Sequence, residues 1–295
     1  IATVLSTIPE FVISYIGAAK IGAITIPMDK AYKKTDFMTL IPHSAPKVII
    51  TIDKWEKNKI ADNLMELKPQ FGDVHYIVVG KHELGSSFDA LMKKEYPFDS
   101  QFEEAKKNQD TNDCILVIWT GGTTGAPKAV ELTHANIIEM CYLEYKKIKE
   151  DLSKIAGFVE RTHEPFLVNL PTSHVGGTVE LIGSSIVGGN EMIMQASWSP
   201  FDSLKAMQEF NLSFMGGVPT MFKIFLSLPN LASYEPKKYL KIVFMSGEKV
   251  SMELLNGIKE YMCENIVIGY GSTEAGSEVT FTEIGDSFED LASGY

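Results

Sequence analysis

The residues best suited to chemistry lie in one loop that is rich in glycine, threonine and lysine. The segment from Trp119 to Val130 reads Trp-Thr-Gly-Gly-Thr-Thr-Gly-Ala-Pro-Lys-Ala-Val. Glycine lets the backbone turn tightly and bring its N–H groups close to an anion. Threonine hydroxyls can donate to phosphate oxygens or bind a metal held by them. Lys128 adds a positive charge and Pro127 stiffens the loop before it. The loop therefore predicts a cradle for a polyphosphate.

Two other interpretations apply to such a loop. A cluster of glycine and threonine can also be an ordinary hairpin turn. The Walker phosphate loop is a poor match, because it requires Gly-Lys-Ser/Thr at the start of a helix. Here Ala126 and Pro127 separate Gly125 from the lysine, and Ala129 follows it.

A second group of polar residues follows another apolar segment, in the run Gly269-Tyr-Gly-Ser-Thr-Glu274. The ring of Tyr270 can stack on another flat ring, the Thr273 hydroxyl can donate a hydrogen bond, and the Glu274 carboxylate can hold a hard cation, which prefers oxygen ligands. The alternative is a simple turn in which Thr-Glu opens a helix.

The elements that position these residues are apolar strands that alternate with amphipathic helices. The pattern predicts strands at 23–27, 48–51, 76–79, 114–118, 129–133, 166–170, 191–194, 214–218, 241–244 and 266–268. It predicts helices from a Thr7 cap to about Lys20, and at 35–44, 54–67, 88–94, 134–152, 202–210, 219–227 and 252–262. Residues 101–113 are predicted to be a surface connection. Strand–helix repetition with apolar strands implies an α/β fold with mostly parallel sheets flanked by helices. The mixed-charge segment 151–164 suggests two subdomains, residues 1–155 with the phosphate loop and 156–295 with the second motif.

Composition excludes several classes of protein. The 295 residues are 45% hydrophobic and 22% charged, as in a globular protein with a sizeable core. The formal net charge of −11 argues against a nucleic-acid surface. The three cysteines have no zinc-site spacing, and reduced thiols indicate a cytoplasmic protein. No apolar run reaches about 18 residues, so we expect no transmembrane span and, without a basic N-terminal segment, no signal peptide.

The loop at 119–130 resembles a long and specific signature, Tyr-Thr-Ser-Gly-Thr-Thr-Gly-x-Pro-Lys-Gly. This is the signature of the adenylate-forming, or AMP-binding, superfamily, which includes acyl-CoA synthetases, luciferases and peptide-synthetase adenylation domains. The run at 269–274 matches the Gly-Tyr-Gly-x-Thr-Glu motif of the same superfamily. The chain departs from the first signature at Trp119, at Gly121 and at Ala129, which replaces the usual glycine after the lysine.

The resemblance implies roles for individual residues. It implies catalytic roles for Thr120, Lys128, Thr273 and Glu274, with Glu274 holding the metal. The turn Ser246-Gly-Glu-Lys249 looks like the superfamily's Ser-Gly-Gly-(Ala/Glu) turn beside adenine, although Ser246 stands where glycine is usual. The implied nucleotide-binding residues are Thr120, Gly121, Gly122, Thr123, Thr124, Gly125, Lys128, Ser246, Gly247, Glu248, Lys249, Gly269, Tyr270, Gly271, Ser272 and Thr273.

The resemblance also implies an acyl pocket, lined by His174, Val175, Gly176, Gly216 and Gly269. His174 falls where the superfamily has an aromatic residue or histidine at the mouth of this pocket. Peptide-synthetase domains carry a Phe-Asp pair there, whose carboxylate holds the substrate's α-amine. His-Val offers no charge to pair with an ammonium, so a carboxylic acid without an α-amine is favoured.

Together the resemblances imply an acid–thiol ligase that uses ATP, Mg²⁺ and CoA to activate a small-molecule carboxylic acid in fatty-acid metabolism. An adenylation enzyme that loads an aryl acid or a carrier protein, a luciferase-like oxygenase and a non-catalytic AMP-binding module are the alternatives. The chain corresponds to the large N-terminal domain of acyl-CoA synthetases, and we expect the β-barrel subdomain and the C-terminal domain with its lysine to be absent. These 295 residues alone are therefore expected to turn over poorly.

Overall fold

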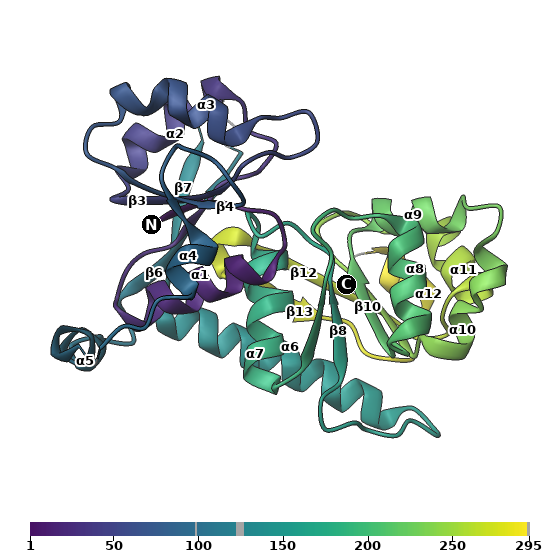
Figure 1. The fold of residues 1–295 in the computed structure, drawn as a ribbon. Helices are drawn as coiled ribbons and strands as arrows, with labels where there is room; N and C mark the ends of the chain where they lie inside the picture. The colour runs from purple at the N-terminus through teal and green to yellow at the C-terminus, as the bar shows by residue number, and fades with distance from the viewer. Residues whose placement is uncertain (98, 122–126, 294–295) are drawn as a thin grey trace. The chain divides into compact units, whose positions relative to one another are not determined.

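The computed structural model describes residues 1–97, 99–121 and 127–293 (Figure 1). Contacts group the chain into two compact units. Unit 1 contains Ile1–Ala135 and Pro171–His174, and unit 2 contains Asn136–Leu170 and Val175–Tyr295. The chain thus passes from one unit to the other three times. The division into two subdomains between residues 155 and 156 stays a prediction.

Unit 1 is built on a parallel five-stranded sheet with strand order β2-β1-β3-β4-β5. Its strands are β1 (Ala2–Val4), β2 (Ile26–Pro27), β3 (Val48–Ile52), β4 (His75–Val79) and β5 (Ser86–Ser87). Its helices are α1 (Pro9–Lys20), α2 (Lys34–Ser44), α3 (Ile60–Leu67), the 3₁₀ turn η1 (Lys68–Gln70), α4 (Phe88–Met92) and α5 (Ser100–Lys107). β-Branched residues dominate the central strands, which are buried as parallel strands require.

A separate antiparallel hairpin in unit 1 consists of β6 (Cys114–Thr120) and β7 (Lys128–Thr133). The hairpin is joined to the chain before β2, because Thr25 N donates to Ile115 O at 2.8 Å and Val117 N donates to Thr25 O at 2.9 Å. These bonds fix the base of the hairpin, which carries the predicted phosphate loop at its other end.

Unit 2 contains a four-stranded sheet in the order β10-β11-β12-β13, in which β13 alone is antiparallel, and a parallel pair of β8 and β9. The strands are β8 (Pro165–Val168), β9 (Glu191–Met194), β10 (Phe214–Gly217), β11 (Ile242–Met245), β12 (Ile266–Ser272) and β13 (Ser277–Phe281). The α-helices are α6 (His134–Lys154), α7 (Ser184–Gly188), α8 (Pro200–Glu209), α9 (Pro219–Leu226), α10 (Pro236–Tyr239), α11 (Met252–Tyr261) and α12 (Phe288–Ser293). A π-helix, η2 (Gly176–Gly183), precedes α7, and 3₁₀ turns occur at η3 (Leu231–Tyr234) and η4 (Thr273–Ala275).

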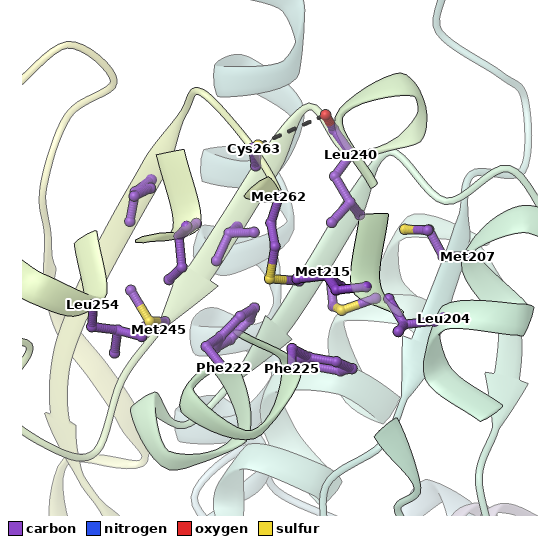
Figure 2. Close-up of a cluster of buried hydrophobic side chains, with 14 of the residues drawn as sticks. Leu204, Met207, Met215, Phe222, Phe225, Leu240, Met245, Leu254, Met262 and Cys263 are labelled. Atoms are coloured by element: carbon purple, nitrogen blue, oxygen red, sulfur yellow. Dashed lines mark hydrogen bonds between the residues drawn. The ribbon is translucent and has the colours of Figure 1, made fainter. Parts of the chain in front are cut away.

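The core of unit 2 lies between its sheet and helices α8, α9 and α11 (Figure 2). Met215 of β10 and Met245 of β11 meet Phe222 and Phe225 of α9 there, and all four side chains are fully buried. Residues along a strand alternate between its two faces, so Phe214 belongs to the opposite face. That face carries a row of phenylalanine rings with centroids 5.4 to 6.3 Å apart, formed by Phe166, Phe214, Phe244 and Phe281.

Two predicted elements of unit 1 differ in the structure. The helix predicted for 54–67 begins only at Ile60, because Glu56 has a left-handed φ of 49° and Trp55 and Asn58 pair through their backbones in a tight turn. The predicted surface connection 101–113 contains α5, whose N-cap Asp99 accepts a hydrogen bond from Gln101 N at 2.8 Å. This helix has no buried residue, so its sequence lacks the apolar stripe from which a helix is predicted.

The first helix also begins differently from the prediction. Its N-cap is Ile8 and not Thr7, and Pro9 occupies the first turn. The remaining predicted helices and strands fall within a few residues of the observed ones, and the α/β class with mostly parallel sheets and flanking helices is confirmed. Among the described residues, no helix combines the length and the apolar character needed to cross a bilayer.

Candidate functional site

The hairpin of β6 and β7 positions the two ends of the predicted phosphate loop. Thr120 and Lys128 are opposite each other in the register of the two strands, and the Thr120 hydroxyl lies 3.5 Å from the carbonyl oxygen of Lys128. Lys128 is exposed, and its ammonium group has no partner within the described part of the chain. Gly121 is exposed, and no atom of the other described residues lies within 4 Å of the place where its Cβ would be. Gly122, Thr123, Thr124 and Gly125 lie outside the described residues.

Two turns of unit 2 meet at the carboxyl ends of β10 and β11. Ser246 N donates to Gly217 O at 3.3 Å, and Thr220 Oγ1 lies 2.9 and 3.2 Å from the two carboxylate oxygens of Glu248. Gly247 has a φ of 84°, a left-handed conformation that favours glycine. The exposed Lys249 completes the turn. Ligands of open α/β sheets bind outside the carboxyl ends of the strands, so this edge is the expected location for a nucleotide in unit 2.

The Tyr270 motif forms the end of the neighbouring strand β12 and the η4 turn. A bulge between Tyr270 and Gly271 interrupts the pairing of β12 with β13. A Cβ on Gly271 would lie 2.1 Å from the carbonyl oxygen of Ser277, so the close approach of the two strands requires glycine. The Tyr270 side chain at this bulge is 71% exposed. Bulges commonly change the direction of a side chain beside a functional site.

The η4 turn presents the remaining polar groups of this motif. Ser272 caps the turn by accepting a hydrogen bond from Ala275 N at 3.3 Å, and Thr273 opens it half-buried. The Glu274 carboxylate is exposed and has no hydrogen-bond or ion-pair partner among the residues that the structure describes. The same residues contain no group of three acidic, His or Cys side chains that could hold a metal ion. A single free carboxylate fits Mg²⁺, which binds one or two carboxylates together with water and substrate phosphates.

His174 belongs by its contacts to unit 1, in the short segment Pro171–His174. This segment is held there by Ser173 Oγ, which donates to the Asp29 carboxylate at 3.1 Å, and by Thr172 Oγ1, which lies 3.5 Å from Leu5 O. The His174 side chain is exposed. Val175, the next residue, belongs to unit 2 and precedes the π-helix η2.

The glycines predicted to leave room for an acyl group are closely surrounded in the structure. A Cβ on Gly269 would lie 2.7 Å from both the Glu278 carboxylate and the Phe244 ring. On Gly216 it would lie 3.4 Å from the Phe214 ring, and on Gly176 it would lie 2.9 Å from Leu170 Cδ1. The side chain of Glu278 therefore fills the space that Gly269 leaves.

Three glutamates next to these glycines were not among the predicted site residues. Glu144 of α6, Glu180 of η2 and Glu278 of β13 lie together, and Glu144 and Glu278 are each only 4% exposed. Burial raises the pKa of all three carboxyl groups, and that of Glu144 reaches about 8. The neighbouring carboxyl groups add to the upward shift of the pKa for Glu144 and Glu180. The available signal was Glu180 in the apolar run Thr-Val-Glu-Leu-Ile, an acid where the pattern predicts burial.

Comparison with known protein families identifies the family of this chain. The sequence matches the AMP-binding enzyme family over residues 1–293, nearly its whole length. The chain belongs to the AMP-binding enzyme family. The predicted resemblance to the adenylate-forming superfamily is thereby confirmed.

Relatives of this AMP-binding chain include two proteins of Bacillus subtilis (strain 168). One is a putative acyl-CoA synthetase, YngI, which is 27% identical over 96% of this chain and 53% of its own length. The other is a long-chain-fatty-acid–CoA ligase, which is 27% identical over 93% of this chain and 51% of its own length. The chain thus spans about half the length of the curated relatives it matches. The fold resembles that of the anthranilate CoA ligase AuaEII in complex with anthranoyl-AMP, with a TM-score of 0.77 at 17% identity over 97% of this chain and 52% of that chain.

Proposed function

We propose that this chain is the nucleotide-binding part of a ligase that activates a carboxylic acid with ATP and transfers the acyl group to CoA. The observation that carries the proposal is the match to the AMP-binding family over residues 1–293, together with the free Glu274 carboxylate and exposed Tyr270 ring at the ends of strands. The names of the relatives as acyl-CoA synthetases and CoA ligases support the thiol as acceptor.

In this proposal the phosphates of ATP bind the hairpin loop. Thr120, Thr123 and Thr124 donate hydroxyl hydrogen bonds to the β- and γ-phosphates, and the backbone N–H of Gly122 adds a further donor. Lys128, which has no partner among the described residues, neutralises part of their charge. This neutralisation stabilises the pyrophosphate as it leaves, which is where negative charge accumulates in the reaction.

The second set of residues holds the remainder of the nucleotide. Tyr270 stacks on adenine, Thr273 donates to the α-phosphate, and Glu274 holds the Mg²⁺ that accompanies ATP. The turn from Ser246 to Lys249 lies along adenine.

The reaction then proceeds by two displacements. An oxygen of the substrate carboxylate attacks the α-phosphorus, the bond from that phosphorus to the bridging oxygen breaks, and pyrophosphate leaves with the electron pair. The CoA thiolate next attacks the acyl carbon, and AMP leaves. No covalent bond to the protein is required, so the chain contributes by positioning and by charge stabilisation.

The acid is proposed to lack an α-amine and to enter beside His174 and Val175, with the acyl group against Gly216, the least crowded of the three predicted pocket glycines. His174 is exposed and Val175 is neutral, so the segment offers no carboxylate to pair with an ammonium. Fatty acids fit this description, as do aryl acids.

The proposal is tested by calorimetry of the 295-residue chain with Mg·ATP and with a non-hydrolysable acyl-adenylate analogue. Because a charge-assisted hydrogen bond contributes about 1.5–3 kcal/mol, Lys128→Ala is expected to weaken ATP binding about 10- to 100-fold. The matched control is Lys81→Ala, which removes another exposed lysine of unit 1 without an ion pair among the described residues. Equal affinity of the K128A variant and the unchanged chain would contradict the proposal.

Turnover provides the second test. The chain alone is expected to catalyse ATP–pyrophosphate exchange poorly, because it spans only about half the length of its relatives. Exchange at the rate of a full-length CoA ligase would refute that expectation. A screen of fatty and aryl acids for enhanced binding of ATP then identifies the acid.

A further inference from the structure

A cluster of three carboxyl groups in unit 2, two of them buried and the third, that of Glu180, in a half-buried residue, has no role in the proposed function. It consists of Glu144, Glu180 and Glu278, called the glutamate triad below. Its members come from α6, η2 and β13, which lie far apart in the sequence. The triad therefore marks the point at which these three elements meet.

Hydroxyl groups surround the triad and connect it to the candidate site. Ser277 Oγ donates to Glu180 at 2.5 Å, and Ser184 Oγ donates to Glu144 at 3.3 Å. Ser246, in the turn after β11, donates to Glu278. One oxygen of Glu144 and one of Glu278 accept no hydrogen bond from the described residues although both are buried. Protonation gives a carboxyl group an O–H donor, which can satisfy such an unpartnered acceptor oxygen.

Within the part of the chain that the structure describes, no lysine, arginine or histidine forms an ion pair with a member of the triad. The ion pairs there involve other aspartates and glutamates. Lys147 follows Glu144 by one turn of α6, but it pairs with Asp151 at 2.8 Å and with Glu283 at 3.2 Å. Among the described residues, the buried thiol of Cys141 on α6 also faces the triad. On the β12 and β11 side the neighbours are Gly269 and the Phe244 ring.

We propose that the glutamate triad is a proton-operated latch, which in its protonated form holds β13 and the π-helix η2 against α6 and which releases them when it ionises. Three carboxylates without a cation cannot all be charged in a buried site, because desolvation and mutual repulsion both oppose ionisation. Protonated, the carboxyl groups donate and accept hydrogen bonds and replace the missing partners.

The latch acts on the two turns that flank the candidate nucleotide site of unit 2. Glu278 is opposite Gly271 in the β12–β13 register and also accepts the hydrogen bond from Ser246. Ionisation of the triad therefore loosens the Tyr270 turn and the Ser246 turn together. The inference concerns the folded chain without any nucleotide, so it can fail or hold independently of the proposed ligase activity.

The direction of the pH effect follows from the raised pKa values. In the unfolded or locally open chain these glutamates ionise near pH 4.5, whereas in the closed state burial keeps them protonated to higher pH, about 8 for Glu144. Between these values the closed state holds protons that the open state has lost, so raising the pH favours opening. Each such proton changes the opening equilibrium about tenfold per pH unit.

The experiment is hydrogen exchange measured by mass spectrometry on the full 295-residue chain between pH 5.5 and 9, corrected for the chemical exchange rate. Peptides covering Gly176–Gly183 and Ser277–Phe281 are expected to lose protection about tenfold per pH unit for each proton released. The helix α11 (Met252–Tyr261) is the internal reference and is expected to change little. An equal loss of protection in α11 would overturn the proposal.

The variants Glu144→Gln and Glu278→Gln keep the shape of a protonated glutamate but cannot ionise. Each is expected to flatten the pH dependence, whereas the control Glu139→Gln, an exposed acid on the same helix, leaves it unchanged. The unchanged slope in E144Q and E278Q would refute the latch. Infrared spectra of the unmodified chain give a test that does not depend on variants folding. A band of protonated carboxyl at pH 6.5 that disappears by pH 9 supports the latch, and its absence at pH 6.5 refutes it.

Discussion

Replacement of Gly183 by alanine should expose how tightly the π-helix packs on α6. A Cβ at residue 183 would lie 2.3 Å from Cys141 Sγ, far inside the 3.5–4.0 Å at which such atoms make favourable contact. The other neighbours, Thr178 O at 3.4 Å and Cys141 Cβ at 3.6 Å, are at ordinary contact distances. The clash therefore involves one sulfur atom.

The expected magnitude follows from two opposing effects. Inserting a methyl group into a packed interior costs about 1–3 kcal/mol. Gly183 has helical φ and ψ of −62° and −47°, so alanine gains about 1 kcal/mol through its lower backbone entropy in the unfolded chain. We expect Gly183→Ala to lower the free energy of unfolding by about 0–2 kcal/mol.

The second variant, Cys141→Ala, removes the sulfur and its 3.3 Å hydrogen bond to Val179 O. Alone it should cost about 1 kcal/mol, as deletion of one buried group of this size does. In that background the alanine at 183 fills the vacated space without a clash, so Gly183→Ala should stabilise the chain by about 1 kcal/mol. The coupling between the two positions is then about 1–3 kcal/mol.

The assay is urea unfolding followed by the fluorescence of Trp198, which packs edge-on against Phe225 in the core of unit 2 at 5.9 Å. Trp55 and Trp119 belong to unit 1 and are replaced by phenylalanine in all four proteins of the cycle, so that the signal reports unit 2. A coupling below about 0.5 kcal/mol, the range in which independent sites add, would show that the sulfur does not limit residue 183.

Two further predictions concern other parts of the chain. Gly17 lies inside α1 with open space where a Cβ would be, so Gly17→Ala should raise the free energy of unfolding by about 0.5–1 kcal/mol, measured in urea, and a loss of stability would contradict the open space. Burial raises the pKa of Cys263 to about 12 and also raises that of Cys141, whereas Cys114 is half-buried and the upward shift of its pKa is smaller. Iodoacetamide should therefore label Cys114 first at pH 8, as measured by peptide mass spectrometry. Earlier labelling of Cys263 would show that its thiol is not buried.

Much of the fold could be predicted because most strands are apolar, β-branched runs in the sequence. Runs such as Val48–Ile52 and Cys114–Thr120 are apolar and β-branched, and the structure places strands there. Short polar helices could not be predicted in this way, since α5 is held by a cap at Asp99 and buries nothing. The late start of α3 arises from a left-handed residue, Glu56, that no propensity favours.

The candidate site was predicted only in part. The motif residues Thr120, Lys128, Tyr270 and Glu274 could be named because their spacing is characteristic of the AMP-binding family. The triad could not be predicted, because its members are 36 and 98 residues apart along the chain (144 to 180 and 180 to 278) and only tertiary structure brings them together. Periodicity reports which side of an element is buried, and it does not report what lies opposite.

The four residues Pro171–His174 have a consequence for dissecting this protein. They return the chain to unit 1 in the middle of unit 2, so neither unit is one continuous stretch of sequence. A shortened protein starting at residue 136 would retain Thr172 and Ser173 but lose Leu5 and Asp29, their hydrogen-bond partners. No single cut separates the two halves cleanly. Swapping segments between related ligases will therefore succeed only where this short return and its partners are exchanged together.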